Sequence, residues 1–242
     1  MSFTYLITGA GRGLGYEYSK ALLAAKPNIR VVAAARDPAG SEQLQTLKKE
    51  NEGRMYLLKL EVTDPEQAKQ AAKELEESGF LGDGGIDALV NCAGIAVNHL
   101  IPPSELTRKD ILDNLEVNVF GILAVNEAFL PLIRKSKAKQ IFHVSSSVGS
   151  IEYWGGNTLF SAYAISKTTL NMYSRKLASE LGLEGFTVVP VKTGLNKMDD
   201  GTQNGDLEPE EAAKFAVKNI FLKVTPADNG VFYTHDGAVR PW

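Results

Sequence analysis

Thr8-Gly9-Ala10-Gly11-Arg12-Gly13-Leu14-Gly15 is the stretch that decides the fold. It follows an apolar run, Phe3 to Ile7, and a helix-like segment continues from Leu14 to Ala25. A strand, a glycine turn and a helix start in this order favour phosphate binding. The glycines allow the backbone to adopt positive φ and to come close to a phosphate group. The start of the helix offers that phosphate free N–H groups and the positive end of the helix dipole. An ordinary βα turn is the alternative, but four glycines directly after a strand favour a nucleotide site.

Length and composition are those of an ordinary globular protein. The 242 residues are 44% hydrophobic and 23% charged, so residues 1–242 are expected to form one α/β domain with an ample core. A net charge of −3, without a basic run, argues against nucleic acid or an anionic membrane as partner. The apolar runs are too short to span a bilayer, and no leader precedes Phe3. With Cys92 as the only cysteine, we expect a cytoplasmic protein without an intrachain disulfide.

The end of the second predicted strand, residues 29–35, bears on the choice of cofactor. In a dinucleotide-binding fold an acidic residue about 20 positions past the glycines bonds the ribose 2′-OH of NAD, whereas an arginine accommodates the 2′-phosphate of NADP. Ala35 stands at that position here, and Arg36 follows it. Arg12, inside the glycine turn, is a second cation that could face the same phosphate. We therefore expect NADP(H), with two merely solvated arginines as the alternative.

Strands and helices are predicted to alternate along the rest of the chain. The expected elements are a helix at 41–52, a strand at 55–60, a helix at 66–78 capped by Asp64, a strand from 86 to a turn at 91–94, one long helix at 105–135 with a kink at Pro131, a strand at 139–144, a helix at 161–181, a strand at 186–190, a helix at 210–222 and a strand at 230–233. This order predicts a Rossmann-type, doubly wound parallel sheet of about seven strands with helices on both faces. Residues 196–206 are expected to form a flap.

Tyr163 and Lys167 are four residues apart, so on a helix their side chains share one face. A neighbouring ammonium lowers the pKa of a tyrosine, which makes a usable proton donor and acceptor. A serine hydroxyl at the end of a neighbouring strand could bond the same carbonyl oxygen, and residues 145–147 are three serines. Asn118 lies on the apolar side of the long helix, where it needs hydrogen-bond partners or a chemical task. Taken alone, Tyr163 and Lys167 could simply be neighbours on a helix surface. Because they follow the glycine turn and the polar strand ends in one ordered pattern, an active site is favoured.

Together these motifs resemble the short-chain dehydrogenase/reductase family, in its common form of about this length and over the whole chain. Thr8-Gly9-x-x-x-Gly13-x-Gly15 is similar to the family's cofactor turn, Asn91-Cys92-Ala93-Gly94 to its Asn-Asn-Ala-Gly turn, and Tyr163-x-x-x-Lys167 to its active-site pair. Gly11-Arg12-Gly13 with Arg36, residues 149–151 and the ending Phe232 to Trp242 resemble the carbonyl-reductase-like members, the norsolorinic acid ketoreductase, sniffer and C-factor group.

The resemblance implies a catalytic tetrad of Asn118, Ser146, Tyr163 and Lys167. In the family's mechanism Tyr163 would exchange the proton and Ser146 would position the carbonyl. Lys167 would bind the nicotinamide ribose and lower the pKa of Tyr163, and Asn118 would hold a water in a proton relay. Ser146 is preferred to Ser147 because its spacing to the next glycine matches the family's Ser-Ser-x-x-Gly pattern.

The residues expected to bind NADP(H) come from the glycine turn, the strand ends and the active-site pair. They are Gly9, Gly11, Arg12, Gly13, Leu14, Gly15, Arg36, Glu61, Val62, Asn91, Ala93, Gly94, Tyr163, Lys167, Pro190, Val191 and Thr193. Glu61 stands where the family has the aspartate that contacts adenine, and Cys92 replaces the second asparagine of its turn. The turn from Pro190 to Thr193, which in the family bonds the nicotinamide carboxamide, lacks the family's glycine.

We therefore expect an NADPH-dependent oxidoreductase that reversibly reduces a ketone or aldehyde to an alcohol, with the proton from Tyr163. An NADP(H)-binding sensor or scaffold with little turnover is one alternative, motivated by the short turn after Pro190. An NAD-dependent alcohol dehydrogenase is another. The expected partner is a small-molecule carbonyl substrate, and the resemblance implies a homodimer or homotetramer as one option. The three histidines lack metal-ligand spacing, so no metal is expected.

Overall fold

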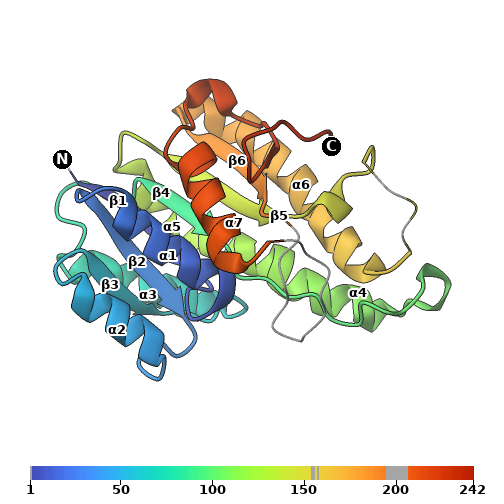
Figure 1. Cartoon of the computed structure of the whole chain (residues 1–242), viewed down its shortest axis with the longest axis horizontal. Helices are drawn as coiled ribbons and strands as arrows, with labels where there is room; N and C mark the ends of the chain where they lie inside the picture. The colour runs from blue at the N-terminus through green and yellow to red at the C-terminus, as the bar shows by residue number, and fades with distance from the viewer. Residues whose placement is uncertain (1, 154–155, 157, 195–206) are drawn as a thin grey trace.

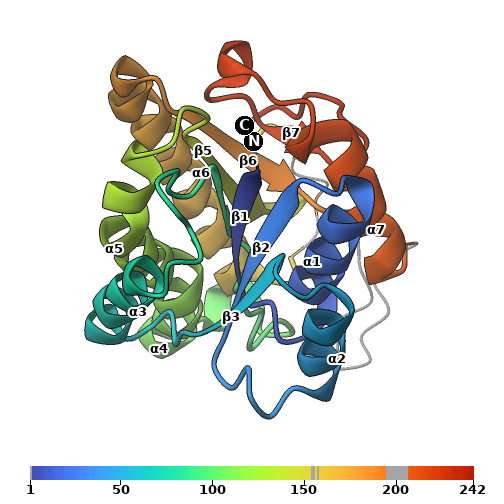
Figure 2. The ribbon, with the colours of Figure 1, turned by 90° about the vertical axis from the view of Figure 1, so that its left-hand side faces the viewer.

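A single seven-stranded sheet forms the centre of the molecule (Figures 1 and 2). The structure, a computed structural model, describes residues 2–153, 156, 158–194 and 207–242. All strands run parallel in the order β3-β2-β1-β4-β5-β6-β7. The strands are β1 Phe3–Thr8, β2 Ile29–Ala35, β3 Met55–Lys59, β4 Ala88–Asn91, β5 Gln140–Ser145, β6 Thr187–Lys192 and β7 Tyr233–Thr234. The predicted Rossmann-type fold is confirmed.

Helices cover both faces of this sheet (Figure 2). One face carries α1 Gly13–Ala25, α2 Glu42–Glu50 and α7 Pro209–Ala216, and the other carries α3 Pro65–Glu77, α5 Ile122–Arg134 and α6 Ser161–Leu181, with α4 Arg108–Leu115 packed on α6. The inner strands are therefore buried on both sides and read as continuous apolar runs rather than alternating ones. Asp64 caps α3 as predicted, since its side chain accepts a hydrogen bond from Gln67 N at 3.0 Å.

The predicted long helix at 105–135 begins later and is less regular than expected. Thr107 and Asp110 form a capping box that starts α4 at Arg108. A π-helical segment, Glu116–Gly121, then joins α4 to α5, so the departure from α-helical geometry precedes Pro131, which lies inside α5. By length and composition alone the helix from Arg108 to Arg134 could cross a membrane, but half of its most apolar window is buried inside the protein. It serves here as a core helix.

The sixth strand extends two residues beyond its predicted end at Pro190. Pro190 pairs with His143 of β5, and β6 continues to Lys192 because both β5 and β7 pair with its last two residues. A proline, which has no N–H to donate, is tolerated here because β7 does not reach this position.

A buried polar network connects β5 to the helices behind it. His143 Nδ1 lies 2.7 Å from Ser174 Oγ, and Nε2 lies 3.3 Å from Asn126 Nδ2. Ser174 donates its own proton to a backbone carbonyl of α6, so it accepts from Nδ1–H, and Nε2 accepts from Asn126. Burial, aided by the charge of Lys167, lowers the pKa of His143 to about 3. The imidazole is therefore neutral, with both nitrogens bonded.

This network predicts a loss of stability in acid. The folded pKa lies below the unfolded value of about 6.5, so the stabilisation is complete above pH ~6.5 and declines as the pH falls towards the folded pKa. Below pH ~6.5 we expect the free energy of unfolding to fall by up to about 1.4 kcal/mol per pH unit more in the wild type than in His143→Asn. Urea unfolding of both proteins at several pH values measures the difference. Equal slopes in the wild type and His143→Asn would contradict the assignment.

Candidate active site

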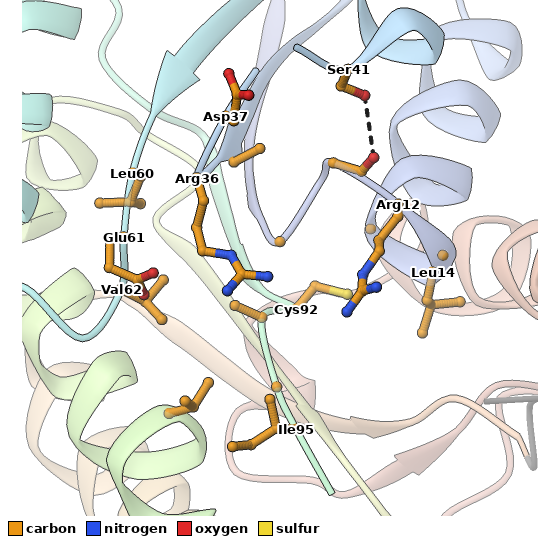
Figure 3. Close-up of a pocket in the computed structure, with 18 of the residues that line it drawn as sticks. Arg12, Leu14, Arg36, Asp37, Ser41, Leu60, Glu61, Val62, Cys92 and Ile95 are labelled. Atoms are coloured by element: carbon orange, nitrogen blue, oxygen red, sulfur yellow. Dashed lines mark hydrogen bonds between the residues drawn. The ribbon is translucent and has the colours of Figure 1, made fainter. Parts of the chain in front are cut away.

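A cavity of about 650 Å³ lies at the carboxyl ends of β1 to β4 (Figure 3). Such an edge gathers the turns that follow neighbouring parallel strands, and ligands of this fold class bind there. The predicted cofactor residues that line it are Gly9, Gly11, Arg12, Gly13, Leu14, Gly15, Arg36, Glu61, Val62, Ala93 and Gly94. Four separate turns of the chain are thus brought together as the sequence predicts.

The glycine turn has the shape that a ligand close to the backbone requires. A Cβ on Gly15 would lie 2.4 Å from Gly9 O, so this glycine lets α1 start directly against the turn. Gly13 has φ 53°, and a Cβ on it would meet no protein atom within 4 Å. The first turn of α1 has neither a side-chain cap nor an acidic residue. Its N–H groups and positive dipole end therefore suit a phosphate.

Two arginines extend into the same part of the cavity from different walls (Figure 3). Arg36 directly follows β2, and Arg12 is the N-cap residue of α1. Ala35 occupies the last position of β2, where an NAD-type site would carry an acid. The carboxylate of the next residue, Asp37, accepts a hydrogen bond from Gly40 N at 2.9 Å. Two guanidinium groups at this position provide a fit for a 2′-phosphate.

Several lining residues escaped the sequence prediction. They are Ala35, Asp37, Gly40, Ser41, Leu60, Cys92, Ile95, Val117 and Pro209. Most are immediate neighbours of predicted residues and could have been found by extending each strand end. Ser41 also braces the glycine turn, because its hydroxyl donates to Gly11 O at 3.3 Å (Figure 3). Pro209 begins α7, far along the chain, and no local signal points to it.

The predicted catalytic side chains meet beside the end of β5. Ser146 follows this strand, and its hydroxyl lies near that of Tyr163 on α6, close enough to act on the pKa of the phenol. Lys167, one turn further along α6, donates from Nζ to Val144 O at 2.8 Å and lies 5.5 Å from the centroid of the Tyr163 ring. Gly149 allows this packing, because a Cβ on it would lie 2.7 Å from the backbone of Lys167.

Asn118 connects these side chains to the cavity. It lies fully buried in the π-helical segment, where its Oδ1 accepts from Ile95 N at 2.9 Å and its Nδ2 donates to Ile95 O at 2.8 Å and Ser166 Oγ at 2.9 Å. A Cβ on Gly94 would lie 3.1 Å from Asn118 Oδ1 and 3.6 Å from Lys167 Nζ. Since Gly94 and Ile95 line the cavity, its inner end lies next to Asn118 and Lys167.

Burial sets the protonation states of Tyr163 and Lys167, and the result differs from the expectation that the pKa of Tyr163 is lowered. It raises the pKa of Tyr163 to about 12, with the nearby Ser146 hydroxyl opposing the shift and Cys92 adding to it. Burial also lowers the pKa of Lys167 to about 8. The expected lowering of the Tyr163 pKa by Lys167 is therefore absent, because the amine is already neutral at the pH where the phenol titrates. At neutral pH Tyr163 therefore holds its proton.

Six predicted cofactor residues do not line the cavity, and two of them, Tyr163 and Lys167, lie beside the end of β5. Asn91 is buried with its amide donating to Asn126 Oδ1 at 3.0 Å, away from the turn that follows it. Pro190 and Val191 lie inside β6 rather than in a turn, and Val191 packs in the core below α1 and α7. Thr193, the first residue after β6, is buried. The predicted flap at 196–206 lies outside the described residues.

Comparison with known proteins agrees with this geometry. The family model for short chain dehydrogenases matches residues 4–206. An uncharacterized oxidoreductase of Schizosaccharomyces pombe is 32% identical over 98% of this chain and 97% of its own length. Among solved structures, the carbonyl reductase Sniffer of D. melanogaster (TM-score 0.91, 27% identity) and an NADPH-bound carbonyl reductase from chicken fatty liver (TM-score 0.87, 30% identity) both match over 100% of each chain.

The fold and the family model lead to the same conclusion. The family match at residues 4–206 includes β2 to β6 and nearly all of β1, and the structural match to a carbonyl reductase extends over the whole chain. This chain belongs to the short-chain dehydrogenase family of oxidoreductases.

Proposed function

We propose that this protein is an NADPH-dependent reductase that converts a ketone or aldehyde into an alcohol, reversibly, with Tyr163 as the proton donor. The observation that carries the proposal is the position of Tyr163. This protonated phenol lies beside the Ser146 hydroxyl and near the inner end of a cavity whose outer part holds two arginines. The likeness to an NADPH-bound carbonyl reductase at 30% identity supports it.

The cavity supports the choice of NADPH. Arg12 and Arg36 would hold the 2′-phosphate, and the glycine turn with the start of α1 would hold the pyrophosphate. Glu61, whose carboxylate is fixed by hydrogen bonds from Thr63 N at 3.2 Å and Thr63 Oγ1 at 3.0 Å, would lie beside the adenine. When bound, the cofactor supplies a hydride to the carbonyl carbon.

Residues of the chain would hold the carbonyl oxygen and transfer a proton to it. Ser146 and Tyr163 would both bond the carbonyl oxygen, and Tyr163 would release its proton as negative charge develops there. A pKa of about 12 keeps the phenol protonated at neutral pH, which suits reduction. Alcohol oxidation needs the deprotonated phenol, so it should be favoured only at higher pH. Lys167, charged below its pKa of about 8, would bond the ribose, and Asn118 would support proton resupply through a water.

Removal of one hydroxyl tests the proton donor. Tyr163→Phe keeps the ring and the helix, so we expect cofactor binding to persist while kcat falls by about 10²- to 10⁴-fold, the usual contribution of a general acid. The measurement is NADPH oxidation with a panel of aromatic aldehydes and keto esters. Tyr173→Phe is the matched control, because its hydroxyl lies on the same helix but is bonded to Asn126. Wild-type turnover in Tyr163→Phe would refute the assignment.

Two glycines provide a matched test of the phosphate site. Gly13 and Gly53 both have positive φ (53° and 76°), and a Cβ on either would meet no protein atom within 4 Å, but only Gly13 lines the cavity. Gly13→Ala should therefore weaken NADPH binding by at least about tenfold, because its methyl group occupies ligand space. Gly53→Ala should carry a similar conformational cost and leave the affinity unchanged. Fluorescence titration measures both, and equal affinities would place the phosphates elsewhere.

A further inference from the structure

The C-terminal segment packs against the loop that follows Ser146. Ser150 Oγ donates to Pro241 O at 2.7 Å, and Glu152 N donates to Trp242 O at 2.9 Å. Trp242 is anchored in turn on Phe232, with ring centroids 5.6 Å apart. The end of the chain is therefore held beside the loop that carries the candidate catalytic serine.

This packing places a cation beside that loop. The guanidinium of Arg240 lies 3.8 Å from the centroid of the Tyr153 ring, and its backbone N donates to Phe232 O at 2.7 Å. Arg240 Nε is buried, and no described residue accepts a hydrogen bond from it. A buried donor without an acceptor costs free energy, so a ligand that supplies an acceptor here would be bound favourably.

A second cation comes from the sheet. Lys192 is the last residue of β6 and pairs in register with Ser145 and with Thr234 of β7. It therefore lies one strand away from the residue that precedes Ser146. Its side chain is half-buried, and Tyr153 and Arg240 both lie close enough to influence its charge.

No carboxylate in the described part of the chain forms an ion pair with either cation, and Lys192 forms no side-chain hydrogen bond there. Burial, followed by the charge of Arg240, lowers the pKa of Lys192 despite the opposing effect of Asp236. The carboxylate of Asp236 is already bonded by the hydroxyl of Thr234 and by Ala238 N. The local field is thus positive and only partly screened by water.

We propose that Lys192 and Arg240 bind an anionic group, a carboxylate or a phosphate, on the carbonyl substrate. The inference rests on the proposed reductase function and narrows its substrate class. The strand register pairs Lys192 with Ser145, the residue before the serine that would hold the carbonyl oxygen, so one small molecule can reach both positions. Two half-buried cations attract an anion, and the Nε–H of Arg240 offers it a charge-assisted hydrogen bond.

The test compares aldehydes that differ only in charge. 4-Carboxybenzaldehyde, 4-formylphenyl phosphate and the neutral methyl 4-formylbenzoate are reduced with NADPH by the wild type, Lys192→Met, Lys192→Arg and Lys218→Met. Lys218 is an exposed lysine on the segment after α7 and serves as the control. We expect Lys192→Met to lower kcat/KM for at least one charged aldehyde by about tenfold, through KM, and to leave the ester unchanged. Lys192→Arg should keep the wild-type preference for the charged aldehyde over the neutral ester. Comparison of the phosphate-bearing and carboxylate-bearing aldehydes identifies which anion the site binds.

A second readout does not depend on turnover. Ligand-observed NMR should detect terephthalate, but not neutral terephthalamide, on the wild type and on Lys218→Met, and should detect neither on Lys192→Met. The absence of terephthalate binding, or an equal loss for charged and neutral aldehydes in Lys192→Met, would overturn the anion site. Selective terephthalate binding without reduction of any aldehyde would support the anion site and count against the reductase instead.

Discussion

The contact between the turns after β1 and β4 is the constraint on which the rest of the site depends. The hydroxyl of Thr8 accepts hydrogen bonds from both Cys92 N (3.0 Å) and Ala93 N (3.1 Å), which joins the two turns. A Cβ on Gly9 would lie 2.8 Å from Ala93 Cα, so only glycine permits this approach. The contact brings Gly94 up against Lys167 and Asn118. The phosphate end and the chemical end of the cavity are therefore set by one local packing arrangement.

Burial determines the protonation states of the catalytic candidates. On a helix surface a tyrosine and a lysine four residues apart would remain an ordinary pair, but here Lys167 is buried and Tyr163 is half-buried. Desolvation raises the pKa of Tyr163 and lowers that of Lys167. Tyr163 therefore keeps a proton that it can donate, and the positive charge of Lys167 becomes easier to lose. The same desolvation makes every hydrogen bond to a developing oxyanion stronger.

Sequence alone predicts the fold and most of the cofactor cavity, because strand ends and glycine turns are local signals and parallel pairing places them together. Prediction from sequence fails where contacts between distant parts of the chain determine the position of a residue. Asn91 turns inward because Asn126 offers it a partner, and Pro190 stays in the sheet because β7 extends the strand past it. The proximity of Lys192 to Arg240 depends on how the C-terminal segment folds back, which no local pattern encodes.

If this cavity holds NADPH next to a proton donor, deuterium should pass from the nicotinamide to the substrate. The wild type and Arg36→Ala are given a carbonyl compound with NADPH or NADH deuterated at the nicotinamide C4, and the alcohol is examined by mass spectrometry. We expect deuterium on the carbinol carbon, a wild-type preference for NADPH of about ten- to a hundredfold, and loss of that preference in Arg36→Ala. Cofactor that binds without transferring label, or equal use of both cofactors by the wild type, would contradict this expectation.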